Sequence, residues 1–293
     1  MTQDRPLPLL LVTGLAFGCN FPLGKLAVEA GVNPALWAVV ICLGAGLMVL
    51  AAARLFEPAG PARPPGLLRY ALTSSLVSNV IPLVLTFSAM PHIGAGLTAI
   101  LVATSPLSTA LLAMVFKVRP PRLAELAGLG LGLAGAVIIV AARHQLLAAD
   151  ASRWLFAAAL IPLFLGAGNV YRSFAWPRGA GPMRLGAMVN LAAVPALLLL
   201  AGLQGGLDLA PLARVPGLVA AQLAASTVMY LTFFRLQAVG GPTYLSQIGY
   251  VAAAVGVGIG VSLLGERYPP LVWAGVAVVA LGITLTSLAQ RRR

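Results

Sequence analysis

The sequence is poor in charged residues. Only 9% of its 293 residues are Asp, Glu, Lys or Arg, whereas 60% are hydrophobic, and its mean hydropathy is +0.96. A typical soluble domain carries about 25% charged residues. The composition therefore excludes an ordinary soluble protein and indicates a polytopic, all-α integral membrane protein.

Acidic residues are the scarcest charged type, with seven Asp and Glu in the whole chain. None falls in the middle of an apolar run, because those beyond the first few residues lie at run ends or in loops: Glu29, Glu57, Glu125, Asp150, Asp208 and Glu266. A proton-coupled exporter of lipophilic cations needs a buried carboxylate, so this mechanism is disfavoured. Glu125 and Glu266 are expected to pair locally with Arg122 and Arg267.

Cysteine and histidine are also scarce. Cys19 and Cys42 lie inside apolar runs, and His92 and His144 are isolated in predicted loops. These residues offer neither a disulfide framework nor a metal site, and no nucleophile–base set is visible. We therefore expect no metal, no cofactor and no enzymatic activity.

The formal net charge of +12 does not indicate nucleic-acid binding. The basic residues are spread singly between apolar runs, rather than gathered in one patch. The expected partners are the lipid bilayer and a small-molecule substrate; the oligomeric state is not indicated, and a monomer is compatible with the sequence. The first apolar run continues past Asn20 to Lys25 without a small-residue cleavage site, which favours a retained helix over a signal peptide.

Apolar runs of about 20 residues, the length that spans a bilayer, occur ten times. Pro and Gly mark most of the short breaks between them. The ten predicted spans cover residues 7–29, 34–54, 67–90, 93–117, 121–142, 153–175, 183–203, 214–237, 241–264 and 269–289.

The second half of the chain repeats the first. Leu85-Thr86-Phe87 recurs as Leu231-Thr232-Phe233, and Pro120-Pro121 recurs as Pro269-Pro270, at offsets of 146 and 149 residues. A shared offset indicates an internal duplication. The predicted units are residues 1–145, holding the first five helices, and residues 150–293, holding the last five.

Loop charges predict the orientation of these repeats. Of the 19 basic residues, fourteen fall on one side of the predicted helices and five on the other, which places both termini in the cytoplasm by the positive-inside rule. Because each repeat has an odd number of helices, the second must be inverted relative to the first. Transporters built this way bind substrate near the bilayer midplane, in a central cavity between the repeats, and expose it to the two sides alternately.

Polar residues within the apolar runs should face the interior or a water-filled cavity. Many of them recur along one face of a predicted helix, and this pattern, with a few individual polar residues, predicts a cavity lining. The predicted lining residues are Asn20, Lys25, Ser78, Asn79, Pro82, Thr98, Ser105, Asn169, Gln222, Tyr230, Tyr244, Gln247 and Tyr250. Pro82, Pro106 and Pro162 are predicted to kink their helices, and the backbone groups freed there could bind the charged ends of a substrate.

These residues also have structural explanations. Ser and Thr in membrane helices often bond their own i−4 carbonyl or simply allow close packing, and Asn79, Gln222 and Gln247 could join helices instead of contacting substrate. Lys25 could extend to the headgroups or attract a substrate carboxylate. Arg172 and Arg235 lie near predicted helix ends, which favours a role in topology.

Three segments resemble known sequences. They are similar to the repeats of EamA-type members of the drug/metabolite transporter superfamily. The segments are Gly18-Cys19-Asn20-Phe21-Pro22 with Lys25, Gly94-Ala95-Gly96 with Ser105-Pro106-Leu107, and Leu264-Gly265-Glu266-Arg267-Tyr268. The overall pattern most resembles the YddG-type amino-acid exporters of bacterial inner membranes. The resemblance implies ten helices, a central cavity and transport of small metabolites. The first repeat departs from the family pattern, with Lys117-Val118-Arg119 in place of the Gly-Glu-Arg segment.

We therefore predict an inner-membrane exporter of amino acids, aromatic or otherwise amphipathic, or of similar small metabolites. The nearest alternative is a transporter of sugar phosphates or nucleotide sugars, which would need several cations in its cavity to hold the phosphate. A membrane scaffold that transports nothing ranks lower, because it has no need of polar stripes at mid-depth.

Overall fold

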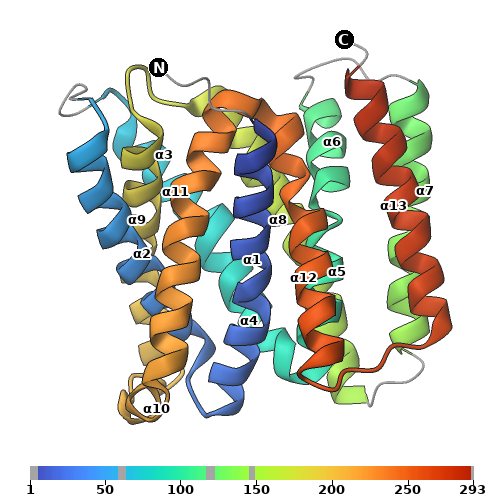
Figure 1. The fold of residues 1–293 in the computed structure, drawn as a ribbon, viewed down its shortest axis with the longest axis horizontal. Coiled ribbons are helices and arrows are strands. Elements are labelled where there is room, and N and C mark those ends of the chain that lie inside the picture. Colours follow the sequence, from blue (N-terminus) through green and yellow to red (C-terminus); the bar gives the residue numbers. More distant parts are fainter. Residues whose placement is uncertain (1–5, 59–63, 117–122, 145–148, 292–293) are drawn as a thin grey trace.

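The computed structural model describes residues 6–58, 64–116, 123–144 and 149–291, and these residues form helices and connecting turns with no strand (Figure 1). The helices are α1 (Pro6–Glu29), α2 (Pro34–Phe56), α3 (Leu67–Ser75), the π-helical turn η1 (Leu76–Val80), α4 (Ile81–Ile93), α5 (Ala95–Val102), α6 (Ser105–Val115), α7 (Leu123–His144), α8 (Ala149–Ala175), α9 (Pro182–Leu203), α10 (Ala210–Arg214), α11 (Pro216–Ser246), α12 (Ile248–Ser262) and α13 (Pro270–Arg291).

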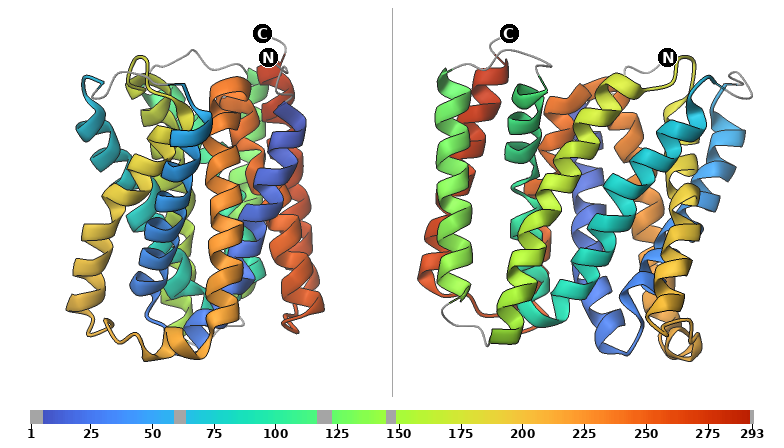
Figure 2. Two further views of the ribbon diagram at one scale, coloured as in Figure 1. Left: turned by 60° about the vertical axis from the view of Figure 1, so that its left-hand side comes forward. Right: turned by 180° about the vertical axis from the view of Figure 1, so that it is seen from behind.

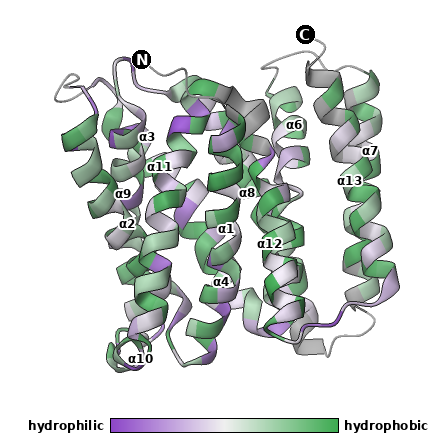
Figure 3. Cartoon of the chain, viewed as in Figure 1, coloured by the Kyte–Doolittle hydropathy of each residue, from purple (hydrophilic) through white to green (hydrophobic). Residues whose placement is uncertain are grey.

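Seven of the helical segments within the described residues are long and apolar enough to cross a membrane. Three shorter apolar helices lie in Leu126–Ile139, Ile248–Ser262 and Pro270–Gly282. Figure 3 shows hydrophobic residues along the whole length of the bundle, and large side chains such as Leu123 and Leu203 are 86% and 77% exposed. Such an apolar outer surface is stable in lipid rather than in water.

The bundle has two ends, which we name from the chain. The start of α1 and the end of α13 lie at one end, here called the termini end (Figures 1 and 2). The end of α1 and the loop that joins α12 to α13 lie at the other, here called the far end. The prediction that the termini end faces the cytoplasm stays a prediction.

The third predicted span is continuous but contains the π-helical turn η1 immediately before Pro82. Proline has no N–H to give to the carbonyl four residues earlier, and its ring crowds that carbonyl. The chain widens at this point, and the N–H of Ile81 bonds to the carbonyl of Leu76, five residues back. Such π-helical turns are frequent at functional sites, and this one carries Ser78 and Asn79 into the interior.

The other two predicted kinks differ from each other. The fourth span is interrupted at Ala103–Thr104, and Pro106 lies in the first turn of α6, where its missing N–H costs nothing. By contrast, α8 runs without a break from Ala149 to Ala175 with Pro162 inside it.

One predicted boundary is wrong. The sequence predicts a break between the spans 214–237 and 241–264, marked by Gly240-Gly241-Pro242, but α11 continues through these residues to Ser246, and the helix is interrupted at Gln247. Gly and Pro disfavour a helix without forbidding it, since the cost of one lost hydrogen bond can be offset by tertiary packing.

Glycines allow α7 and α13 to pack closely along one edge of the bundle. A Cβ atom on Gly135 would lie 2.8 Å from the carbonyl oxygen of Gly275, and one on Gly282 would lie 2.4 Å from the backbone nitrogen of Gly132. Only glycine permits this approach, which is the usual basis of helix association in lipid.

Candidate functional site

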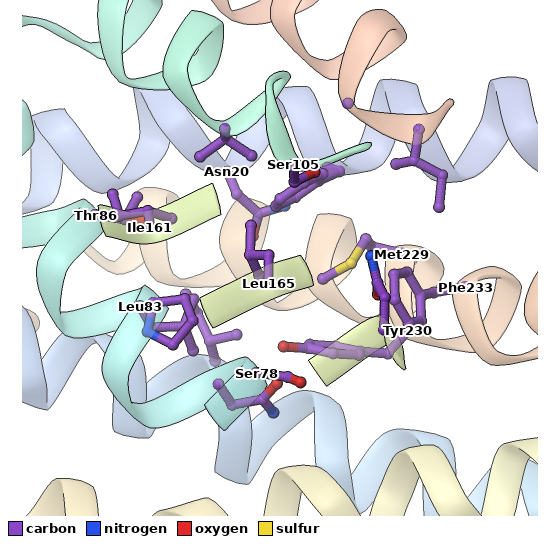
Figure 4. A pocket seen from close by; sticks show the side chains of 18 of the residues that line it. Asn20, Ser78, Leu83, Thr86, Ser105, Ile161, Leu165, Met229, Tyr230 and Phe233 are labelled. Carbon is purple, nitrogen blue, oxygen red and sulfur yellow. The ribbon is translucent and has the colours of Figure 1, made fainter. Parts of the chain in front are cut away.

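A cavity lies inside the bundle and is lined by residues from both halves of the chain. The cavity has a volume of about 100 Å³. In Figure 4, Met229, Tyr230 and Phe233 lie on one side and Leu83, Thr86 and Ile161 on the other. The polar residues of its wall are Asn20, Ser78, Asn79, Thr86, Ser105, Asn169, Arg172 and Tyr230.

The structure places about half of the predicted lining on this wall: Asn20, Ser78, Asn79, Pro82, Ser105, Asn169 and Tyr230. Among the other described residues, Thr98, Gln222, Gln247 and Tyr250 lie away from the wall, as does Lys25. The Thr98 hydroxyl donates to the Gly94 carbonyl at 2.7 Å, which is the structural role considered for such residues. The side chain of Tyr244 lies outside the described residues.

Gln222 acts behind the wall by joining α11 to α1. Its amide donates to the Asn20 side-chain oxygen, which also accepts from the Ser226 hydroxyl at 2.9 Å. Gln222 and Ser226 are fully buried. The Asn20 amide in turn donates to the Ala16 carbonyl at 2.7 Å. This network holds Asn20 at the cavity edge.

Asn190 on α9 plays a similar role and was not predicted. It is fully buried, and its side-chain oxygen accepts from the Asn79 amide at 3.2 Å. Its own amide donates to the Gly186 carbonyl at 2.9 Å. The signal was available in the sequence, because Asn190 is a lone amide in the middle of an apolar run.

The position of Arg172 near a helix end suggested that its side chain lies at the membrane surface, but the side chain is buried inside the bundle. It is 3% exposed, and its guanidinium donates to the Ser78 hydroxyl and to the Asn169 side-chain oxygen, both at 2.6 Å. The guanidinium carbon lies 5.3 Å from the centre of the Phe233 ring, in cation–π geometry. Arg172 is thus a buried cation of the cavity wall.

A second hollow lies next to the cavity. Its volume is about 390 Å³, and its lining includes Arg172, Ser173, Trp176, Pro182 and Gln237. Arg172 is common to both hollows. Figure 2 shows that α8, which ends at Ala175, and α9, which begins at Pro182, meet at the termini end, so the second hollow lies toward that end.

At the far end, Glu266 joins α1 and α5 to the loop between α12 and α13. We call this arrangement the Glu266 clasp; its residues are Lys25, Ala95, Gly96, Glu266 and Tyr268. Lys25 Nζ lies 2.8 Å from Glu266 Oε1, the N–H groups of Ala95 and Gly96 donate to the carboxylate at 2.7 and 2.9 Å, and the Tyr268 hydroxyl donates to Oε2. The sequence predicts that Glu266 pairs with Arg267, but its observed partner is Lys25, whose charge it neutralises. This contact also explains why Lys25 is neither on the cavity wall nor free to bind substrate.

The clasp stabilises ionised Glu266. Burial raises the pKa of Glu266, but the bonds from Lys25, Tyr268 and the N–H groups of Gly96 and Ala95 outweigh it and hold the pKa below the ordinary 4.5. Because the pKa is lower in the folded state, this stabilisation is complete above pH 4.5 and is lost as the pH falls through the folded-state value.

We expect acid to lower the unfolding temperature less in Glu266→Gln than in the parent protein, as measured by thermal unfolding in detergent from pH 7 to 3. Parallel curves would contradict the assignment.

The first half of the chain matches a known family. Residues 5–141 match the model of the EamA-like transporter family. The match covers α1 to most of α7, including Asn20, Ser78, Asn79 and Ser105 of the cavity wall.

Similarity to individual proteins extends over nearly the whole chain. The uncharacterized inner membrane transporter YedA of Escherichia coli strain K12 is 28% identical over 293 residues, which cover 97% of this chain and 92% of that protein. The YedA proteins of strains CFT073 and O157:H7 give the same values. A protein known from a crystal structure has a TM-score of 0.69 over 100% of both chains at 19% identity, which establishes a shared fold.

Proposed function

We propose that the chain exports amino acids or similar amphipathic metabolites across the bacterial inner membrane by alternating access, since residues 5–141 match the model of the EamA-like transporter family. The family and the inner-membrane relative indicate a transporter of the drug/metabolite type rather than an enzyme. Such a protein has lipid and a small molecule as its partners. Beyond this general transporter assignment, we propose the substrate class, the direction of transport and the cytoplasmic location of both termini.

The observation that carries the proposal is the cavity itself. A cavity with polar groups on its wall, inside an apolar bundle, is costly unless it serves a pathway. Aromatic and aliphatic side chains such as Phe17, Met229 and Phe233 supply an apolar wall, while Asn20, Ser78 and Asn169 supply hydrogen bonds. This combination suits a small molecule with one apolar part and one polar part.

The pattern of helix packing supports the two inverted repeats, residues 1–145 and 150–293, and hence ten spans. The sequence offset relates α1 to α8, α2 to α9, α4 to α11, the α5–α6 span to α12, and α7 to α13. Accordingly, α1 packs against α11 and α12, and α8 packs against α4 and α6. Helix α2 packs against α9, and α7 packs against α13. The offset that relates the two repeats exchanges the two helices within each of these pairs. Inverted repeats would give these pairings.

The alternative of a sugar-phosphate or nucleotide-sugar transporter is less well supported. A phosphate dianion would favour several converging cations. Among the described residues of the cavity wall, Arg172 is the only Lys or Arg, and Lys25 is engaged by Glu266 at 2.8 Å.

The test is counterflow in proteoliposomes that contain the purified full-length protein. Labelled phenylalanine outside should accumulate in vesicles preloaded with unlabelled phenylalanine, and should not accumulate in empty vesicles. Failure with phenylalanine, leucine and methionine alike would remove the amino-acid assignment.

The same assay tests the cavity. Leu165 lies on its wall, so we expect Leu165→Trp to fill the space and lower the initial rate by about tenfold or more, since a packed interior has no room to yield. Leu163 is on the same helix, is 43% exposed and is not part of the cavity wall, so Leu163→Trp is the matched control and should keep the parent rate. Equal rates for both variants would mean that substrate passes elsewhere.

A further inference from the structure

Arg172 carries a buried positive charge for which the described part of the chain provides no carboxylate. It is 3% exposed, and its hydrogen-bond partners are the neutral Ser78 and Asn169. The described wall of the cavity contains no Asp or Glu. Leaving a buried cation without an opposite charge is costly, so this arrangement needs a reason.

The guanidinium also has bonding capacity left over. It carries five N–H donors, of which two make the bonds to Ser78 and Asn169. Its Nε atom is buried and has no hydrogen-bond partner among the described residues. Arginine binds carboxylates through paired N–H groups, and unused donors beside a cavity provide for such binding.

Extension of the side chain to the membrane surface does not account for this geometry. Arg172 is three residues before the end of α8, so a side chain seeking water would extend toward Ala175 and the termini end. Instead it reaches Asn169, one turn in the opposite direction, and Ser78 on η1, which packs against α8. Side chains on helices lean toward the N-terminus, and here the Ser78 and Asn169 contacts retain the guanidinium at depth.

We propose that Arg172 binds the carboxylate of the transported molecule, and that the cavity selects amphipathic monocarboxylates, including those that lack an amine. This inference rests on the proposed transport function and narrows its substrate class. One cation matches one negative charge, and Phe233, 5.3 Å from the guanidinium carbon, supplies an apolar surface next to the charge. The described wall offers an ammonium group no anionic partner, so the amine of an amino acid contributes little to binding.

Four ligands that share a phenyl group but differ in charge show which charge the site prefers. They are 3-phenylpropanoate (anion), L-phenylalanine (zwitterion), 3-phenylpropanamide (neutral) and 2-phenylethylamine (cation). With the full-length protein in nanodiscs of neutral lipid, titration calorimetry should show that the propanoate binds about tenfold or more tightly than the amide, as expected for a charge-assisted bond. It should bind at least as tightly as phenylalanine, and the cation should bind most weakly.

Variants connect this preference to Arg172. We expect Arg172→Gln to bind the acid and the amide equally, while Arg172→Lys keeps part of the preference because it keeps the charge but loses the planar fork. Arg69→Gln removes one positive charge from an exposed position on α3 and should preserve the parent preference. Gel filtration and thermal unfolding would show that the variants are folded.

The outcomes are distinct. Equal affinity of the parent protein for acid and amide would overturn the inference whether or not Arg172→Gln folds, and would leave the transport proposal intact. A parent preference that persists in folded Arg172→Gln would overturn the assignment to Arg172. Tighter binding of glucose 6-phosphate than of the propanoate would show a phosphate site instead. If none of the ligands binds and counterflow also fails, the proposed function falls together with the inference.

Discussion

Replacing Glu266 by alanine should lower the free energy of unfolding by about 3–5 kcal/mol, the usual cost of removing one partner from a buried ion pair. The Lys25 side chain, only 13% exposed, would lose its partner at 2.8 Å. The N–H groups of Ala95 and Gly96 would lose their acceptor at the start of α5. Denaturant titration in detergent micelles, followed by the circular dichroism of the helices, measures the change.

A neighbouring glutamate provides the control. Glu29 also faces Lys25, but at 3.9 Å and with 45% of its side chain exposed, so Glu29→Gln should cost about 1 kcal/mol or less. If Glu266→Ala unfolds within 1 kcal/mol of the parent protein, the clasp does not hold the far end together.

The clasp also illustrates what local sequence reasoning misses. Glu266 and Arg267 are adjacent, so pairing them is the simplest expectation, but the observed partner Lys25 is 241 residues away. A carboxylate at a helix end can bind any N–H group or cation that tertiary folding brings near it. Fold information was needed to choose between these partners.

Periodicity predicted much of the cavity but not its charge. Ser78, Asn79 and Pro82 were found because polar residues recur along one helical face, and the cavity wall contains all three. Asn190 and Arg172 were missed, the first because a lone amide forms no stripe and the second because distance along the chain from a helix end does not specify side-chain direction. The side-chain direction of Arg172 depends on Asn169 and Ser78.

The boundary error in α11 has a similar cause. Gly240-Gly241-Pro242 has the local signature of a break, yet the helix continues to Ser246. Local propensity sets a cost of a few kcal/mol at such a site, and packing of the remaining helix can exceed it. Repeat offsets and apolar runs are more reliable, because many residues contribute to each.

Replacing Gly282 by valine should separate α13 from α7 and lower the free energy of unfolding by about 3 kcal/mol, at the upper end of the usual cost of overpacking. A Cβ atom there would lie 2.4 Å from the Gly132 nitrogen and 2.5 Å from the Gly128 oxygen. Both are backbone atoms and cannot rotate away, so the helices themselves must move. The denaturant titration used for Glu266→Ala measures this change.

Gly130 provides the matched control on the facing helix. Nothing lies within 4 Å of a Cβ atom at this position, so Gly130→Ala should leave stability unchanged or raise it by up to about 1 kcal/mol through helix propensity. Loss of stability in both variants would indicate a general intolerance of α7 and α13 to side chains. Loss in neither would mean that the two helices do not pack through these glycines. Only loss in Gly282→Val alone supports close backbone contact as the basis of their association.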